Sequence, residues 1–235
     1  MQDLNILVTR PKETASPLLK YLSSHGLKTT WIPTIEIEQL NPIVADKYNK
    51  IIFISIPSVI YGLPLIKTID STIFPIGIGT YNTLMKHSPS RKVILPKKPY
   101  NSNSLIQTLS DCIKEKILII KGEGGKTDLQ DFLIKNNTVD EANVYKRKRP
   151  SISITPFIQR KEAKLIIVTS NEGLDNLISL SLPDSSIFKI PIIVISNRML
   201  NYAKFSGFTN VILAQSASNE DIFSSIKHFR RTISE

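Results

Sequence analysis

The sequence predicts an α/β protein built from two similar parallel-sheet domains, one of which is discontinuous in the chain. Short apolar runs, typical of buried strands, alternate with segments whose apolar residues recur at helical spacing. In addition, the segments at 51–63 (IIFISIPSVIYGL) and 75–84 (PIGIGTYNTL) are matched in the same order at 165–177 (LIIVTSNEGLDNL) and 191–200 (PIIVISNRML). A repeated series of strands and helices indicates two copies of one unit, each with parallel strands joined by right-handed crossovers.

The N-terminal segment is predicted to form a strand and then a helix. The run at 6–9 (ILVT) stops at Arg10 and a proline, and apolar residues then recur at helical spacing over 15–22 until Gly26 ends the helix. Residues 29–37 (TTWIPTIEI) contain a proline and alternate apolar with polar side chains. We expect this segment to be an extended connector in the form of a ribbon.

The middle of the chain continues the alternation. Residues 51–54 (IIFI) predict a buried strand, and Pro57 opens the helix that follows. A glycine-containing turn leads into a helix within 76–84, and the run at 93–95 (VIL) predicts one more short strand. Polar residues then cap a helix over 101–109.

The central stretch combines a buried strand at 117–120, a glycine turn at 122–125 and a helix with apolar residues over 129–133. Backbone N–H groups at such a turn are attractive to a phosphate or a carboxylate. The stretch ends at Tyr145, a phenolic donor that stands beside the basic run 146–149.

The triplet at 125–127 (GKT) resembles the end of a phosphate-binding P-loop. That motif requires a glycine at the position of Ile120, so a P-loop is not predicted. The glycines are expected to bind an anion through their backbone or simply to let the strand turn into the helix.

The second copy restarts beyond Pro150, but its fourth strand is missing there. The fourth strand of the first copy lies at 117–120, and its only counterpart for the second copy is the N-terminal run at 6–9. One domain is therefore continuous and the other is assembled from both chain ends. We expect a discontinuous domain at 1–35 plus 149–235, an inserted domain at 40–142, and linker strands at 36–39 and 143–148.

Composition limits the class of protein. With 235 residues and 41% hydrophobic content the chain can bury a core, and no apolar run approaches the roughly 18 residues that span a bilayer. The N-terminus lacks a basic region followed by an apolar signal core, so a cytoplasmic protein is expected. The single Cys112 excludes an internal disulfide, and three scattered histidines make a metal site unexpected.

A formal net charge of +10 favours an acidic partner, which includes nucleic acid, anionic lipid and a polycarboxylate. Aromatic residues are few and are not interleaved with the basic ones, and no helix-turn-helix or zinc-finger pattern is present. Neither nucleic acid nor a membrane is therefore the expected partner.

Hydroxyls, amides, cations and exposed backbone N–H groups follow the predicted strands. In parallel sheets, ligands bind outside the carboxyl ends of the strands. The residues at these positions are Arg10, Ser55, Thr80, Lys121, Gly122, Thr169, Ser170, Ser196, Asn197 and Arg198. Each of them has a structural alternative as a helix cap, above all the two serines at 55 and 170. If linkers let the two domains face one another, these residues would line a cleft for a large molecule with several negative charges.

Several short segments follow one another along the chain in a fixed order: ILVTRP, PTIEI, FIS, IGIGT, LIIKGEGG, NVYK, VTSNEG and FTNVILAQSASNEDI. In this order they resemble the uroporphyrinogen-III synthase family, and the resemblance covers nearly the whole chain. It implies two flavodoxin-like domains, a two-stranded linker and an active site in the interdomain cleft. It also implies a lyase (hydro-lyase) that cyclises hydroxymethylbilane, a linear tetrapyrrole rich in carboxylates, to uroporphyrinogen III with inversion of ring D and loss of water. No cofactor and no metal are expected.

The resemblance also implies roles for individual residues. The tyrosine of the family's V-Y motif falls at Tyr145, where it would hydrogen-bond or protonate the departing hydroxide, and a family threonine falls at Thr80. A second family threonine falls at Met199, which departs from the pattern. Substrate carboxylates would bind to backbone N–H groups near Gly122 and Ser170, with Arg10 and Lys121 nearby, and the other binding positions would be Ser55, Thr169 and Asn197.

Two alternatives stay open at this point. The alternative for Tyr145 is a structural role, as a linker tyrosine that packs a hinge. The whole chain has an alternative as a two-domain binding or regulatory protein that captures an anionic ligand without chemistry. As an enzyme it is expected to be a monomer that receives its substrate in transient contact with hydroxymethylbilane synthase.

Overall fold

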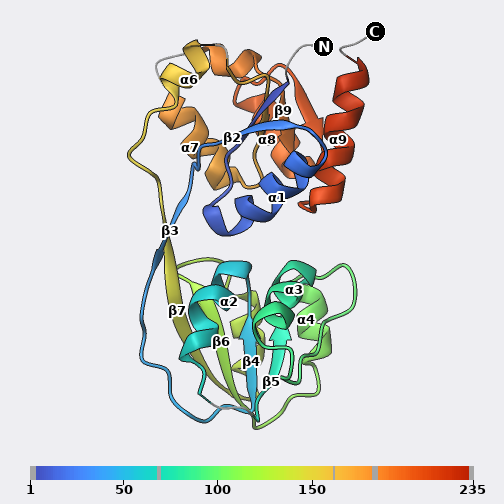
Figure 1. Cartoon of the computed structure of the whole chain (residues 1–235). Helices are drawn as coiled ribbons and strands as arrows, with labels where there is room; N and C mark the ends of the chain where they lie inside the picture. Colours follow the sequence, from blue (N-terminus) through green and yellow to red (C-terminus); the bar gives the residue numbers. More distant parts are fainter. Residues whose placement is uncertain (1–3, 68–69, 161, 182–184, 233–235) are drawn as a thin grey trace. The chain divides into compact units, whose positions relative to one another are not determined.

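The computed structural model describes residues 4–67, 70–160, 162–181 and 185–232 (Figure 1). The chain divides into two compact units. Unit 1 comprises Met1–Glu36 and Lys148–Glu235, and unit 2 comprises Ile37–Arg147. Among the described residues, no helix has both the length and the apolarity needed to cross a membrane.

Unit 1 contains a five-stranded sheet in the order β10-β9-β8-β1-β2. Its strands are β1 (Asn5–Val8), β2 (Lys28–Trp31), β8 (Leu165–Ile167), β9 (Ile192–Val194) and β10 (Val211–Leu213). All neighbouring pairs are parallel. Counted along the chain, the strand order is the 2-1-3-4-5 order of flavodoxin-like folds.

Helices cover both faces of this sheet (Figure 1). They are α1 (Lys12–Ser24), α6 (Thr155–Gln159), α7 (Asn171–Ser181), the 3₁₀ helix η2 (Ser185–Lys189), α8 (Asn197–Phe205) and α9 (Asn219–Thr232). Because successive side chains of a strand point to opposite faces, Leu7 packs with α6, α7 and α8, while Ile6 and Val8 pack with α1 and α9. The near-continuous apolar runs of the strands follow from this burial on both sides.

Unit 2 has the same architecture. Its five-stranded sheet has the order β3-β7-β6-β4-β5, with the strands β3 (Glu36–Gln39), β4 (Lys50–Phe53), β5 (Thr72–Pro75), β6 (Lys116–Gly122) and β7 (Thr138–Lys148). Its helices are α2 (Ile56–Gly62), the 3₁₀ helix η1 (Leu63–Leu65), α3 (Ile78–His87), α4 (Ser102–Thr108) and α5 (Asp128–Leu133). Leu84 of α3 and Val59 of α2 pack on one face, and Leu105 and Leu133 of α4 and α5 pack on the other.

The two sheets confirm the predicted fold class of two similar parallel-sheet domains, one discontinuous. In unit 2, β4 lies between β6 and β5, and in unit 1, β8 lies between β1 and β9. The N-terminal β1 is therefore the counterpart of β6, as the repeat predicted. Residues 36–39 form β3, and 143–148 form the last part of β7.

Three details of the predicted elements were wrong. Residues 29–31, expected as the start of the connector at 29–37, belong instead to the edge strand β2, whose partly exposed side chains lack an apolar run. The expected strand at 93–95 is reduced to an isolated bridge between Val93 and Ile73. The first half of β7 was not recognised, because Thr138, Asp140 and Glu141 gave it a polar appearance.

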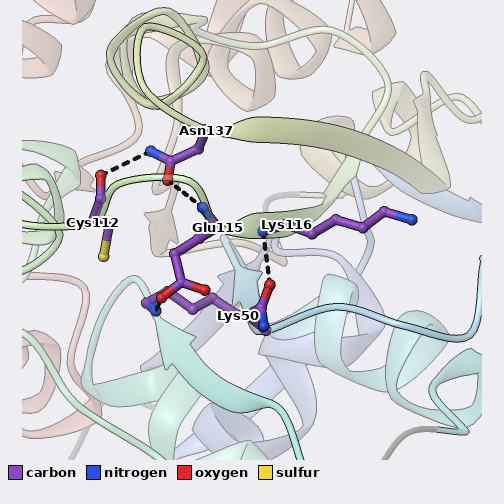
Figure 2. A network of polar contacts seen from close by, with 6 residues as sticks. Lys50, Cys112, Glu115, Lys116 and Asn137 are labelled. Carbon is purple, nitrogen blue, oxygen red and sulfur yellow. Dashed lines mark hydrogen bonds and ion pairs between the residues drawn. The ribbon is translucent and has the colours of Figure 1, made fainter.

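A polar network ties together the amino ends of β4 and β6 (Figure 2). The Asn137 amide donates to the Cys112 carbonyl and accepts from the Glu115 N–H, both at 3.0 Å. Glu115 also forms an ion pair with Lys50. Burial raises the pKa of the Cys112 thiol, so the thiol stays protonated at neutral pH. These hydrogen bonds and this ion pair stabilise the amino ends of the strands, whereas the predicted binding residues follow the carboxyl ends.

Candidate functional site

The candidate site of unit 2 lies where β4, β5, β6 and β7 end. Ser55 follows β4, Thr80 lies in the first turn of α3 after β5, Gly122 ends β6, and Tyr145 lies on β7. Of these residues, the structure brings Ser55 and Gly122 each into contact with Tyr145. Thr80 is buried, with 5% of its surface exposed.

A β-bulge aims the Tyr145 side chain. The register between β6 and β7 shifts after Lys121, which pairs with Asn143, so that Gly122 pairs with Tyr145 and Val144 is the extra residue. In a regular strand, Val144 and Tyr145 would point to opposite faces. Here both belong to one buried cluster, and Tyr145 is only 6% exposed. Bulges re-aim side chains in this way beside functional sites.

Gly122 makes room for the tyrosine ring. A Cβ atom at this position would lie 2.4 Å from Cε2 and 2.5 Å from Cζ of Tyr145. The ring therefore lies directly on the backbone of β6, and the Glu123 N–H donates to the Tyr145 carbonyl at 2.9 Å. A glycine is required here for close approach and not for an unusual backbone angle.

Ser55 fixes the other end of the ring. Its Oγ lies 3.1 Å from the Tyr145 hydroxyl oxygen. The same Oγ accepts the Ser58 N–H at 3.0 Å, and the Ser58 Oγ accepts the Ser55 N–H at 3.0 Å. This reciprocal pair is a capping box at the start of α2. Ser55 thus has the expected structural role as a cap, and it also contacts the proposed catalytic residue.

Lys121 lies on the other face of the sheet from Tyr145. Its side chain borders a cavity of about 200 Å³ with Ile119, Leu129 and Glu141. Its Nζ forms an ion pair with the Glu141 Oε1 at 2.8 Å. Because neighbouring residues on a strand alternate in direction, the structure does not bring Lys121 and Tyr145 together.

Arg10 is the buried cation at the carboxyl edge of the unit 1 sheet. Only 7% of its surface is exposed, and its Nη2 donates to the Ala217 carbonyl at 2.8 Å. Burial lowers the pKa of the guanidinium to about 10. Within the described part of the chain, its Nε has no hydrogen-bond partner and none of the ion pairs includes it. A buried charge without a counterion suits an anionic ligand.

The remaining predicted residues of unit 1 lie at the same edge. Thr169 and Ser170 are half-buried between β8 and α7, and the Ser170 Oγ accepts the Gly173 N–H at 3.0 Å. Asn197 is exposed at the start of α8. Met199, at the position of the family's second threonine, is 3% exposed and packs in the core of unit 1.

Two residues that contact the predicted site residues were not predicted from the sequence. Ser58 completes the capping box around Ser55, and the pattern S-x-x-S, close to the S-x-x-E capping box, was a usable signal. Glu141 of β7 forms an ion pair with Lys121 of the neighbouring strand β6, and no local sequence pattern connects residues 20 positions apart.

Comparisons with known proteins agree with this architecture. The family model of uroporphyrinogen-III synthase HemD matches residues 16–224. The solved uroporphyrinogen-III synthetase from Helicobacter pylori 26695 has 16% sequence identity and a TM-score of 0.65, with 96% of this chain and 99% of that chain covered. A mutant uroporphyrinogen III synthase from the extremely thermophilic bacterium Thermus thermophilus has 9% identity and a TM-score of 0.61, with 98% and 99% covered. At these identities the solved structures establish the fold. Since the family model matches most of the sequence, the chain belongs to the uroporphyrinogen-III synthase family.

Proposed function

We propose that this chain cyclises hydroxymethylbilane to uroporphyrinogen III, with Tyr145 as the residue that assists loss of water. Membership of the family makes the chain a lyase of tetrapyrrole and haem biosynthesis. The observation that carries the role of Tyr145 is its fixed placement. Its ring is held against Gly122, and its hydroxyl is held 3.1 Å from Ser55, at the carboxyl edge of the sheet.

The reaction begins with cleavage of the C–O bond of the hydroxymethyl group on the first ring. The pyrrole nitrogen supplies the electrons, and the phenol of Tyr145 gives its proton to the departing hydroxide, which leaves as water. The fourth ring then attacks through its substituted carbon to form a spiro intermediate, which fragments and closes in the inverted sense. The proton released at the final closure balances the one that the phenol gave. General acid help of this kind contributes about 10²–10⁴ in rate.

The protein must also hold the chain of pyrroles so that the inverted closure is favoured over the direct one. We propose that carboxylates of the substrate bind backbone N–H groups near Gly122 and Ser170. Arg10 and Lys121 provide positive charge, and Thr80 contributes its hydroxyl. The polar positions Ser55, Thr169 and Asn197 complete the proposed binding residues. The buried guanidinium of Arg10 and the net charge of +10 support an anionic substrate.

The isomer of the product is the first test. Purified protein is incubated with hydroxymethylbilane, and the porphyrins obtained after oxidation are separated into type I and type III. Formation of type III beyond the spontaneous type I product is expected. Only type I product, together with tight binding of the tetrapyrrole, would support the alternative of a non-catalytic binding protein.

The role of Tyr145 is tested by Tyr145→Phe, which keeps the ring and removes the donor. Its kcat is expected to fall about ten- to a thousandfold while product binding and folding change little. Tyr48→Phe is the matched control, because Tyr48 is buried in the same cluster and donates to the Asp140 Oδ2 at 2.9 Å. That control should lose some stability and keep turnover. Turnover of Tyr145→Phe within twofold of the parent would remove the phenol from the mechanism.

We also propose that the chain acts as a monomer in the cytoplasm and takes its substrate in transient contact with hydroxymethylbilane synthase. Spontaneous closure of the free substrate to the type I isomer supports such a hand-over, because a shorter time in solution limits the loss. Sedimentation of the chain alone and with that synthase, with and without substrate, tests both statements.

A further inference from the structure

The hydrogen-bonding groups of Ser55 and Ser58 are almost fully assigned. Ser55 uses its N–H and its carbonyl on the Ser58 Oγ, at 3.0 and 2.7 Å, and its own Oγ accepts the Ser58 N–H. The Ser58 hydroxyl therefore donates its one hydrogen to the Ser55 carbonyl. Of the hydrogen-bond donors of these two serines, the Ser55 hydroxyl is the one without an assigned acceptor. In the described structure, the one acceptor within reach of its hydrogen is the Tyr145 hydroxyl oxygen.

The contact between Ser55 and Tyr145 has two possible directions. When Tyr145 donates to Ser55, its proton is turned away from a substrate. When Ser55 donates to Tyr145, the phenol proton is free for another acceptor. A departing hydroxide is a much stronger acceptor than a serine hydroxyl, and the Ser55 hydrogen can rotate about its C–O bond. Substrate ionisation therefore favours the second direction.

We propose that Ser55 is a positioning residue for the reaction, whose hydroxyl donates to the Tyr145 oxygen while Tyr145 gives its proton to the departing hydroxide. This inference rests on the proposed function of Tyr145. As the phenolic O–H bond breaks, negative charge develops on the phenol oxygen, and the Ser55 O–H stabilises that charge. The phenolate regains a proton from the one released at the final ring closure, so the proton balance closes without another reactant.

The surroundings keep this donor in place. The capping box holds Ser55 through two hydrogen bonds with the fully buried Ser58: the Ser55 Oγ accepts the Ser58 N–H, and the Ser55 backbone N–H donates to the Ser58 Oγ. The bulge and Gly122 hold the tyrosine ring, so the two oxygens do not depend on a flexible side chain to meet. A preorganised donor in a poorly hydrated place stabilises developing charge better than water does.

The test compares Ser55→Asp with Ser55→Asn, because the aspartate and asparagine side chains are nearly equal in size. Both side chains can accept the Ser58 N–H and keep the helix cap. Only the asparagine amide can also donate to Tyr145, because an ionised carboxylate has no hydrogen to give. Ser55→Asp is expected to lower kcat about ten- to a hundredfold with KM changed much less. Ser55→Asn should recover most of that loss, and melting temperatures should show that both variants are folded.

A charge control separates this effect from the added negative charge. Asn101 caps α4 by accepting the Ser104 N–H at 3.0 Å, and it is exposed in the same unit. Asn101→Asp places a carboxylate at a second helix cap without touching Tyr145. Its kcat should stay within twofold of the parent.

The background of Tyr145→Phe decides whether Ser55 acts through the phenol. In that background, Ser55→Asp should cost less than twofold in kcat, because the oxygen that Ser55 supports is gone. An equal loss in both backgrounds would overturn the inference and assign Ser55 to direct contact with the substrate. Equal rates for Ser55→Asp, Ser55→Asn and the parent would overturn it as well, while a slow Tyr145→Phe would leave the role of Tyr145 standing. A fully active Tyr145→Phe would instead overturn the proposed function itself.

Discussion

Gly122→Ala should separate the position of the Tyr145 ring from the stability of the protein. The added methyl group would lie 2.4 Å from Cε2 of Tyr145, whereas ordinary contacts begin near 3.4 Å. The ring therefore has to move by about 1 Å, which also moves its hydroxyl relative to Ser55. A misplacement of about 1 Å in a catalytic group can cost about 10²-fold in rate. We expect kcat to fall about 30- to 100-fold in Gly122→Ala, and the free energy of unfolding to fall by about 1–3 kcal/mol from overpacking.

Gly62→Ala provides the matched control. Its added methyl group would lie 2.3 Å from Cγ2 of Ile120, in the same buried cluster that contains Tyr145. It overpacks the core to a similar degree, but it meets an aliphatic side chain instead of the tyrosine ring. Stability is measured by urea unfolding and turnover by the isomer assay. Equal turnover for the two variants, or a fully active Gly122→Ala, would refute the statement that the close approach of ring and backbone sets the rate.

Three further outcomes follow from charges and hydrogen bonds. Arg10→Met should weaken binding of the product about tenfold or more while the melting temperature changes little, because a buried unpaired guanidinium contributes little to stability. Fluorescence titration with uroporphyrin III, the oxidised and fluorescent form of the product, measures this, and unchanged affinity would argue against an anion at Arg10. Product affinity should also fall as the salt concentration rises from about 50 to 500 mM, since screening shortens the range of surface charges. An affinity that does not change with salt would indicate a pocket from which water and salt are excluded. Burial, together with the hydrogen bond to Asp140, raises the pKa of Tyr48 to about 12. This pKa exceeds the value of about 10 in the unfolded chain. The contribution of protonated Tyr48 to the free energy of unfolding is therefore fully present below pH 10 and is lost as the pH rises toward 12. In Tyr48→Phe, the free energy of unfolding measured with urea should therefore fall less between about pH 10 and pH 12 than in the parent protein.

Much of the fold could be predicted from local patterns. Strands buried on both faces require nearly continuous apolar runs, as at Ile51–Phe53 and Leu165–Ile167, and helices on both sides require apolar residues at helical spacing. The repeat then identified the N-terminal strand as the missing member of the second copy. The edge strand β2 was not recognised because its side chains are exposed or only half-buried and form no apolar run, and the first half of β7 was not recognised because most of its side chains are exposed and polar.

The residues at the carboxyl edge of each sheet were also predictable, because parallel strands bring their carboxyl ends to one edge. The residues that follow those ends, such as Ser55, Gly122 and Ser170, were therefore identifiable in advance. The alternation along β6 also implied that Lys121 and Gly122 point to opposite faces, although the sequence analysis grouped them.

Only the tertiary structure decided which of these residues meet. The contact between Ser55 and Tyr145 joins residues 90 positions apart, and it depends on a register shift between β6 and β7. That shift turns Val144 and Tyr145 to the same face, against the alternation that the sequence alone implies. A bulge arises where two strands gain more by packing a side chain than they lose in one interrupted ladder, and that balance belongs to the paired strands together. For this reason the sequence predicted a tyrosine near the site, and the fold determined where its hydroxyl lies.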